Sequence, residues 1–171
     1  MFLMSSGFVL DRFVYWQFRT PFLLLRILCS LLAAVLWFLH GTAFGRKHYK
    51  SLGLPIALLP AFFIAIMIYM TDGPVSPYYA GLNLVLLAVS VVVHWTVRES
   101  FIAVAGVLLM YSIACLRGTK EQLPIIFNNY YFLLLTGIIV VTGNHFFNRL
   151  RFREFVSRYE LDKNKKALEE S

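Results

Sequence analysis

Long apolar runs alternate with short polar segments along the chain, and these runs determine the predicted fold. Five runs approach the roughly 20 residues that an α-helix needs to cross about 30 Å of hydrocarbon. They cover residues 22–40, 54–71, 80–95, 101–116 and 123–147. Each run must be helical, because an isolated strand in lipid leaves its backbone amides unpaired. The pattern therefore predicts an all-α, polytopic bundle of five full transmembrane helices.

The segments on either side of this transmembrane region, which spans residues 22–147, differ from it in character. Residues 1–21 hold too few apolar positions to cross a membrane alone and lack the features of a secretory signal. We interpret them as an interfacial segment or part of a sixth span. Residues 148–171 are highly charged, and neither glycine nor proline occurs from Asn144 to Ser171. The last span is thus predicted to leave the membrane as one unbroken helix, and the absence of a C-cap or breaker up to Ser171 suggests that this helix leads to a further module.

An apolar stripe on this predicted extension leaves two interpretations open. Phe152, Phe155, Val156 and Tyr159 follow each other at helical spacing, which fits the stalk of a dimer. However, the stripe is shorter than the three or four heptads that indicate a coiled coil, so a solvated single helix fits equally well.

Composition and charge support a membrane protein and predict its orientation. The chain is 59% hydrophobic and 15% charged, against about 45–50% and about 25% in soluble domains. Eleven basic residues fall in the 41–53 loop, the 96–99 turn and the C-terminal tail, and four lie on the opposite side: Arg12, Arg19, Arg117 and Lys120. Basic loops stay in the cytoplasm, so the tail is predicted to be cytoplasmic. The net charge of +7 is then explained by topology and anionic lipid, not by nucleic acid.

The polar stretch "MTDGPVSPYYAGLN" (residues 70–83) lies on the predicted outer side. Asp72-Gly73-Pro74 favours a sharp turn, and Tyr78 and Tyr79 suit the headgroup level. The simplest interpretation is a rigid hairpin with an aromatic anchor. Alternatively, this stretch and the second outer loop line a stimulus-binding cavity with apolar walls and a few polar groups. The candidate residues are Asp72, Ser76, Tyr78, Tyr79, Asn83, Asn128, Asn129 and Tyr130.

Arg26 is the one charged residue well inside an apolar run. A charge within the membrane is costly and is a candidate for function, although a side chain this close to the outer end can also extend to the headgroups. We expect Arg26 to pair with Asp72, since both should lie near the outer boundary.

The remaining reactive side chains favour neither catalysis nor a cofactor. His40, His94 and His145 end three spans at the cytoplasmic side, and no two share the i, i+4 spacing of a helical metal site. Cys29 and Cys115 are isolated within apolar helices, as packing residues are. No phosphate-binding loop or catalytic set is apparent, so we predict no catalytic residue, metal or cofactor in this segment.

The stretch "TDGPVSPYYAGLNLVLLA" resembles a segment of multi-span N-terminal input domains of bacterial sensor histidine kinases, many of them hybrid kinases. There it has the form D-G-x-x-S-P-Y-Y-A-G-L, and "GFVLDRFVYWQFRTPFLLLRIL" is similar to their entry into a helix. The resemblance implies a homodimeric sensor in the bacterial inner membrane, with a downstream kinase module that autophosphorylates from ATP and a response regulator as partners. Related regions precede nucleotide cyclases, so a cyclase input domain is an alternative. A small transporter or channel subunit is a second one, although no internal repeat is present.

Overall fold

The computed structural model describes residues 16–42, 49–92 and 96–169, and these residues form helices and no strand. The expected all-α fold is thereby confirmed. The five α-helices are α2 (Arg19–Gly41), α4 (Tyr49–Met70), α5 (Tyr79–Val92), α6 (Val97–Ala114) and α7 (Leu123–Glu169). Short 3-10 turns complete the described chain: η1 (Trp16–Phe18), η2 (Gly73–Val75), η3 (Cys115–Arg117) and η4 (Lys120–Gln122). Most of the N-terminal segment predicted over residues 1–21 lies outside the described residues.

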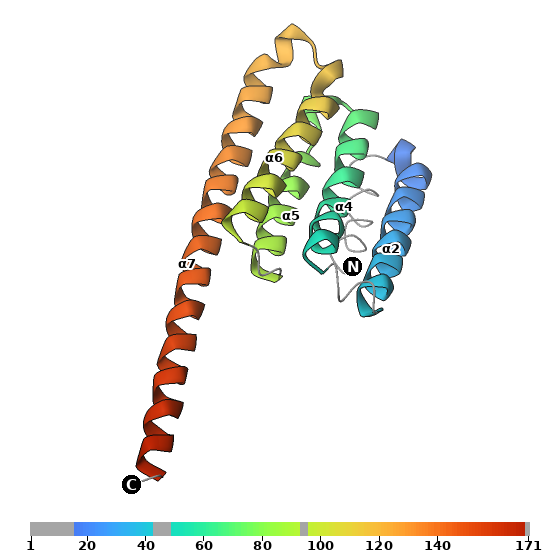
Figure 1. The fold of residues 1–171 in the computed structure, drawn as a ribbon. Helices are drawn as coiled ribbons and strands as arrows, with labels where there is room; N and C mark the ends of the chain where they lie inside the picture. The colour runs from blue at the N-terminus through green and yellow to red at the C-terminus, as the bar shows by residue number, and fades with distance from the viewer. Residues whose placement is uncertain (1–15, 43–48, 93–95, 170–171) are drawn as a thin grey trace.

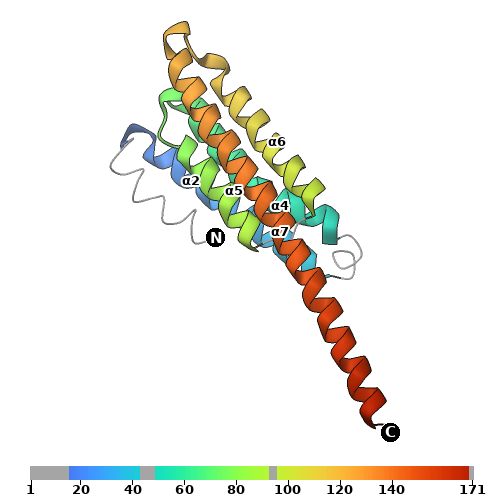
Figure 2. The same cartoon turned by 90° about the vertical axis from the view of Figure 1, so that its left-hand side faces the viewer.

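The helices pack side by side as a bundle with α4 near its centre (Figure 1). One side of α4 contacts α2, and the other contacts α5 and α6. α7 packs against α5 and α6 on the far side of the bundle from α2, which the turned view also shows (Figure 2). The connections 71–78 and 115–122 meet at one end, here called the loop end.

Within the described residues, four helices are long and apolar enough to cross a membrane. Their apolar segments are 20–39, 53–70, 97–114 and part of 120–166, in agreement with four of the predicted spans. The remaining predicted span, 80–95, corresponds to α5, whose 14 residues rise only about 21 Å. Its last three residues, 93–95, lie outside the described part. Large apolar side chains such as Leu28, Leu31 and Ile138 cover the outer faces of the helices, as lipid contact requires.

The start of α6 differs from the prediction for a local reason. The helix begins at Val97, four residues before the apolar run that starts at Phe101. Thr96 caps it: the Thr96 N–H donates to Glu99 Oε2 at 2.8 Å, and the Glu99 N–H donates to Thr96 Oγ1 at 3.4 Å. This reciprocal pair satisfies two backbone donors that the first turn leaves free. The first residue of α6 is therefore not the first residue of its apolar run.

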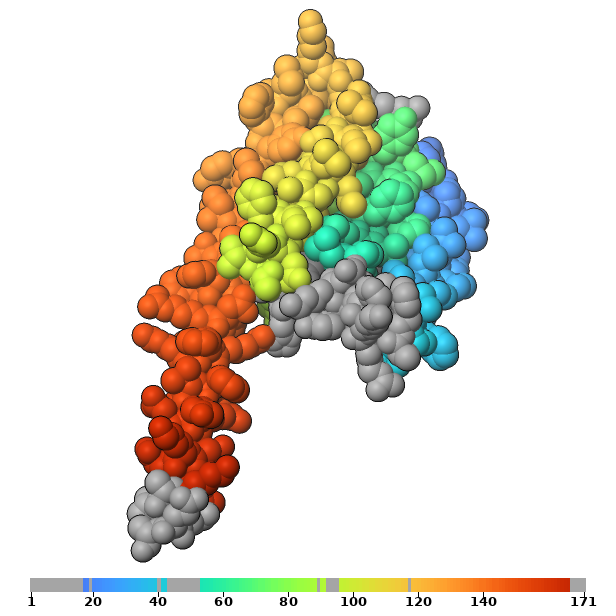
Figure 3. All heavy atoms as spheres, viewed as in Figure 1, coloured from blue at the N-terminus to red at the C-terminus, as the bar shows by residue number. Residues whose placement is uncertain are grey.

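α7 is continuous over 47 residues, which confirms the predicted unbroken last helix. Residues 149–166 are all exposed, and they extend far beyond the bundle in Figures 1 and 3. From Asn144 to Glu169 the helix rises about 37 Å. Glu154 and Arg158 form an ion pair one turn apart on this extension, at 2.6 Å.

Candidate functional site

The connection between α4 and α5 turns sharply at the loop end, as the Asp72-Gly73-Pro74 sequence predicts. Gly73 has a φ of +58°, a conformation that residues with a Cβ rarely adopt. Gly73 and Pro74 are buried in the η2 turn. A Cβ at Gly118 would lie 3.1 Å from Pro74 Cγ, so the two connections are in close contact. The turn therefore presents its backbone to the neighbouring helices and not to the exterior.

Asn129 on α7 joins this turn to α6. Its side-chain amide donates to the carbonyl oxygen of Pro74 at 2.9 Å and to the hydroxyl of Tyr111 at 2.8 Å. Asn129 and Tyr111 are both buried. Each bond contributes about 1 kcal/mol, but a buried partner left without its bond costs about 1–3 kcal/mol. Asn129 thus holds the first turns of α7 against two separate segments.

A second bond between α6 and α7 lies beside the first. The Tyr130 hydroxyl is hydrogen-bonded to Ser112 Oγ, and Ser112 Oγ also donates to the carbonyl of Leu108 at 2.7 Å. Because a serine hydroxyl carries one proton, Tyr130 is the donor to Ser112. The rings of Tyr130 and Tyr111 meet edge to face, with centroids 5.2 Å apart. The loop end of the α6–α7 contact is therefore both hydrogen-bonded and well packed.

Midway along the helices, Gly137 allows α7 to approach α6 closely. A Cβ at Gly137 would lie 2.5 Å from Val104 Cγ1, which is inside van der Waals contact. A glycine is therefore required at this position unless Val104 moves. Close approach at small residues is a common basis of helix association in membranes, where packing replaces the hydrophobic effect as the driving force.

The opposite end of the same contact is again polar. Asn144 Nδ2 donates to Ser100 Oγ at 2.7 Å, and Ser100 Oγ donates to the carbonyl of Thr96 at 3.1 Å. Both Asn144 and Ser100 are buried. The four pairs Tyr111–Asn129, Ser112–Tyr130, Val104–Gly137 and Ser100–Asn144 define the α6–α7 interface. It covers about 22 Å of α7, from Asn129 to Asn144, so a rotation or shift of α7 relative to α6 breaks bonds at both ends.

Four of the predicted stimulus-binding residues take part in internal contacts. Ser76 is buried, and its Oγ is hydrogen-bonded to Thr71 Oγ1 at 2.9 Å. The buried Tyr78 ring meets Phe22 of α2 edge to face, with centroids 5.5 Å apart. Asn129 and Tyr130 belong to the α6–α7 interface described above.

The other four candidates differ in their exposure. Asp72 and Asn128 are exposed, and Tyr79 is half-buried against the core. Asn83 is half-buried on α5, and its Oδ1 is the buried side-chain atom that finds no hydrogen-bond partner within the described residues. A shared stimulus-binding cavity formed by all eight residues stays a prediction.

Arg26 is buried, with 9% of its surface exposed. It lies on the part of α2 that leads from the loop end, and α2 packs against α4, which ends two residues before Asp72. Pairing of Arg26 with Asp72 stays a prediction.

Among the described residues, no group of three histidine, cysteine or acidic side chains is placed to bind a metal. His145 is exposed, and the side chains of His40 and His94 are not among those described.

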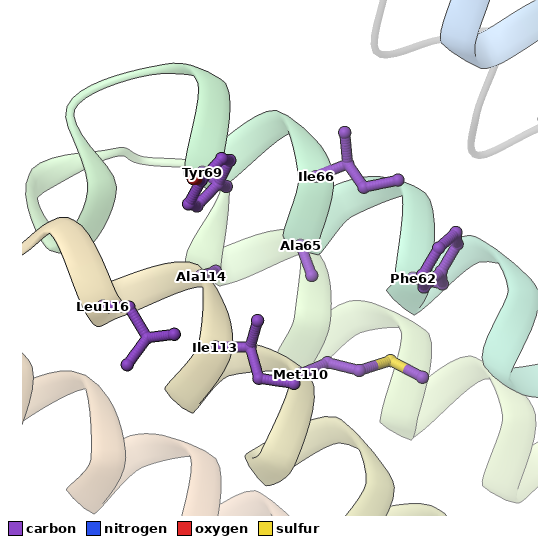
Figure 4. Close-up of a pocket in the computed structure, with 8 residues that line it drawn as sticks. All are labelled: Phe62, Ala65, Ile66, Tyr69, Met110, Ile113, Ala114 and Leu116. Atoms are coloured by element: carbon purple, nitrogen blue, oxygen red, sulfur yellow. The ribbon is translucent and has the colours of Figure 1, made fainter.

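An apolar cavity of about 310 Å³ lies elsewhere, between α4 and α6 near the loop end (Figure 4). None of the eight predicted stimulus-binding residues lines it. Its lining residues are Phe62, Ala65, Ile66 and Tyr69 on the α4 side and Met110, Ile113, Ala114 and Leu116 on the α6 side.

The α6–α7 interface was not predicted from the sequence: Asn129 and Tyr130 were named as stimulus-binding candidates, and no residue of α6 was named. Ser100, Val104, Val107 and Tyr111 recur at alternating steps of four and three residues, and all four are buried. This spacing marks one face of a helix that packs against another. The spacing identifies the buried face of α6, and the polar residues on that face were the available signal for the interface.

Together, the fold and the interface define a multi-pass helical membrane protein whose last helix is fixed to the bundle and extends well beyond it. A family model for membrane-associated sensor domains, MASE8, matches residues 5–162. The chain therefore belongs to the MASE8 family. Comparison with curated proteins and with solved structures finds no match. The family confirms the expected membrane sensor domain, whereas the histidine kinase output stays a prediction.

Proposed function

We propose that this domain is the input domain of a two-component sensor histidine kinase in the bacterial inner membrane. A periplasmic or intramembrane stimulus changes the packing of its helices, and α7 carries that change to a kinase module beyond residue 171. The observation that carries the proposal is the continuity of α7, which runs without a break from the loop end through the exposed extension.

The attachment of α7 explains how such a change reaches the extension. α7 is hydrogen-bonded to α6 near both ends of the bundle, at Asn129 and at Asn144. Between them, Gly137 fixes the separation from α6 through Val104. A displacement of α6 is thus passed to α7 along the whole interface, and the helical backbone carries it onward. A flexible linker transmits no rotation.

A second copy of the chain is the proposed partner of the extension. Phe152, Phe155 and Tyr159 are large apolar side chains on an exposed helix, with Val156 beside them. A helix that is exposed on all sides gains stability when such a stripe packs against a partner, as in two-stranded stalks. A homodimer joined along α7 is thus part of the kinase proposal, and a response regulator completes the expected pathway.

The proposed topology places the tail in the cytoplasm and the loop end outside. Val75 is exposed at the loop end, and Lys163 lies on the extension at the other end. In intact cells, an impermeant maleimide should label Val75→Cys and leave Lys163→Cys unlabelled until the membrane is opened. The opposite result contradicts the topology. Ser76 is a poor site for this test, because it is buried.

A phosphorylation assay tests whether the downstream module is a histidine kinase. The full-length protein in membranes should incorporate label from γ-³²P-ATP into an acid-labile, base-stable bond, as phosphohistidine does. Substitution of the phospho-accepting histidine in the downstream module should abolish this labelling. Formation of a cyclic nucleotide, with no labelled protein, would overturn the kinase proposal in favour of a cyclase input domain.

A further inference from the structure

The cavity between α4 and α6 has a small-residue floor and a large-residue rim. Ala65 and Ala114 are buried, and their short side chains leave a hollow between the two helices. Phe62, Ile113 and Leu116 line the same cavity and are more exposed, so they form its outer edge (Figure 4). The hollow therefore results from alanines at two facing positions of adjacent helices.

This groove faces lipid. In a multi-pass membrane protein, the exposed apolar surfaces of the helices contact hydrocarbon. The rim residue Ile113 is 53% exposed and Leu116 is 77% exposed, so the groove is reached from the bilayer side. Tyr69 supplies the one side-chain oxygen of the lining, and the other lining side chains carry neither oxygen nor nitrogen. An apolar occupant that comes from the bilayer fits such a wall.

The volume of the groove is large enough for part of one hydrocarbon chain. A dry cavity of about 150 Å³ accepts a benzene ring, and this groove has about 310 Å³. Its lining extends along α4 from Phe62 to Tyr69, a rise of about 10 Å. One leaflet of hydrocarbon is about 15 Å thick. A single chain that lies parallel to the helices fits this length, whereas a complete two-chain lipid does not fit this volume.

We propose that the α4–α6 groove binds one acyl chain of a bilayer phospholipid from the leaflet at the loop end. The phospholipid is the assigned source, because it is the apolar molecule that a membrane presents to a laterally open groove. Packing against Ala65 and Ala114 gives the chain contacts that a smooth helix surface does not offer, and such contacts drive association within lipid.

Occupancy of the groove bears directly on α7. Met110 lines the groove, and its neighbour Tyr111 contacts α7, where its hydroxyl accepts the hydrogen bond of Asn129. A chain in the groove holds α4 and α6 apart, whereas loss of the chain lets the helices close over the alanines. α6 then moves relative to α4 and takes α7 with it through the α6–α7 interface. This regulatory step rests on the proposed sensor function, but the binding of the chain does not.

Two substitutions on α6 distinguish binding of a lipid chain in the groove from ordinary lipid contact at the helix surface. Ile113→Trp places a larger side chain at the rim, where it fills the groove. Leu109→Trp is the matched control, since Leu109 lies one turn away, is 63% exposed and does not line the groove. Leu116→Trp provides a second filling variant in case Ile113→Trp fails to fold.

The binding test uses the chain in nanodiscs that contain a phospholipid with a photoreactive diazirine in one acyl chain. Peptide mapping should show several-fold more labelling at Met110 than at Leu109. Ile113→Trp or Leu116→Trp should reduce the Met110 labelling to the Leu109 level, and Leu109→Trp should leave the Met110 labelling unchanged. Equal labelling of Met110 and Leu109 in the unsubstituted chain overturns the proposal. Preferential labelling of the groove by a photoreactive free fatty acid at the same mole fraction overturns the assignment to phospholipid.

The regulatory test measures output of the full-length protein in the same lipid. Ile113→Trp should shift the autophosphorylation rate at least several-fold, and Leu109→Trp should not. Groove labelling that is lost in Ile113→Trp without any change of output contradicts the regulatory step. Failure of the proposed function has a different signature: lipid labelling of the groove persists, while no alteration of α7 affects any output.

Discussion

The contact of Gly137 with Val104 makes Gly137→Ala an unusually specific perturbation. The new Cβ would lie 2.5 Å from Val104 Cγ1, about 1 Å inside the favourable carbon–carbon separation of about 3.5–4.0 Å. Either Val104 leaves its rotamer or the helices separate, and such overpacking costs about 1–3 kcal/mol. The alanine also favours the helix by up to about 1 kcal/mol, so the clash and the helix propensity oppose each other.

Gly143→Ala separates the two effects. It lies on the same helix, and a Cβ there meets nothing within 4 Å. Both variants gain the same helix propensity, so their difference in free energy of unfolding reports the clash alone, about 1–3 kcal/mol. The assay is reversible unfolding in mixed detergent micelles, followed by circular dichroism. Adding Val104→Ala should restore much of the stability lost in Gly137→Ala. Equal stability of Gly137→Ala and Gly143→Ala would refute the close approach of α6 and α7.

Two further predictions concern polar side chains near the loop end. Asn129→Leu leaves the Tyr111 hydroxyl and the Pro74 carbonyl without their donor, and should lower the free energy of unfolding by about 1–3 kcal/mol. The control is Asn128→Leu at the exposed neighbouring position, which should change the free energy of unfolding by less than about 0.5 kcal/mol. Equal losses of stability in Asn129→Leu and Asn128→Leu would argue against the buried hydrogen bonds. If Arg26 pairs with Asp72, the alanine substitutions of these two residues should be non-additive in the same assay, whereas simple addition rejects the pair.

The lengths of the apolar runs predict the bundle well, because a helix in lipid must satisfy its own backbone. The continuity of α7 also follows from sequence, since no glycine or proline interrupts it after Gly143. The start of α6 was placed too late, because a capping pair at Thr96 and Glu99 extends the helix beyond its apolar run.

The site was less predictable, because it depends on how helices align. Asn129 and Tyr130 stand out in the sequence, but their partners Tyr111 and Ser112 precede them by 18 residues on an antiparallel helix. Only the register of α6 against α7 makes them neighbours. The groove is harder still to predict: Ala65 and Ala114 look like any other alanines until two helices place them side by side.

In the proposed mechanism, α7 transmits a change of helix orientation to the module beyond it. One residue inserted after Lys163 turns everything beyond it by about 100°, whereas seven residues restore the original face to within about 20°. Autophosphorylation of the full-length protein should therefore be locked on or off by the single insertion and remain regulated with the insertion of seven. Near-native regulation in both proteins would contradict transmission through a continuous helix.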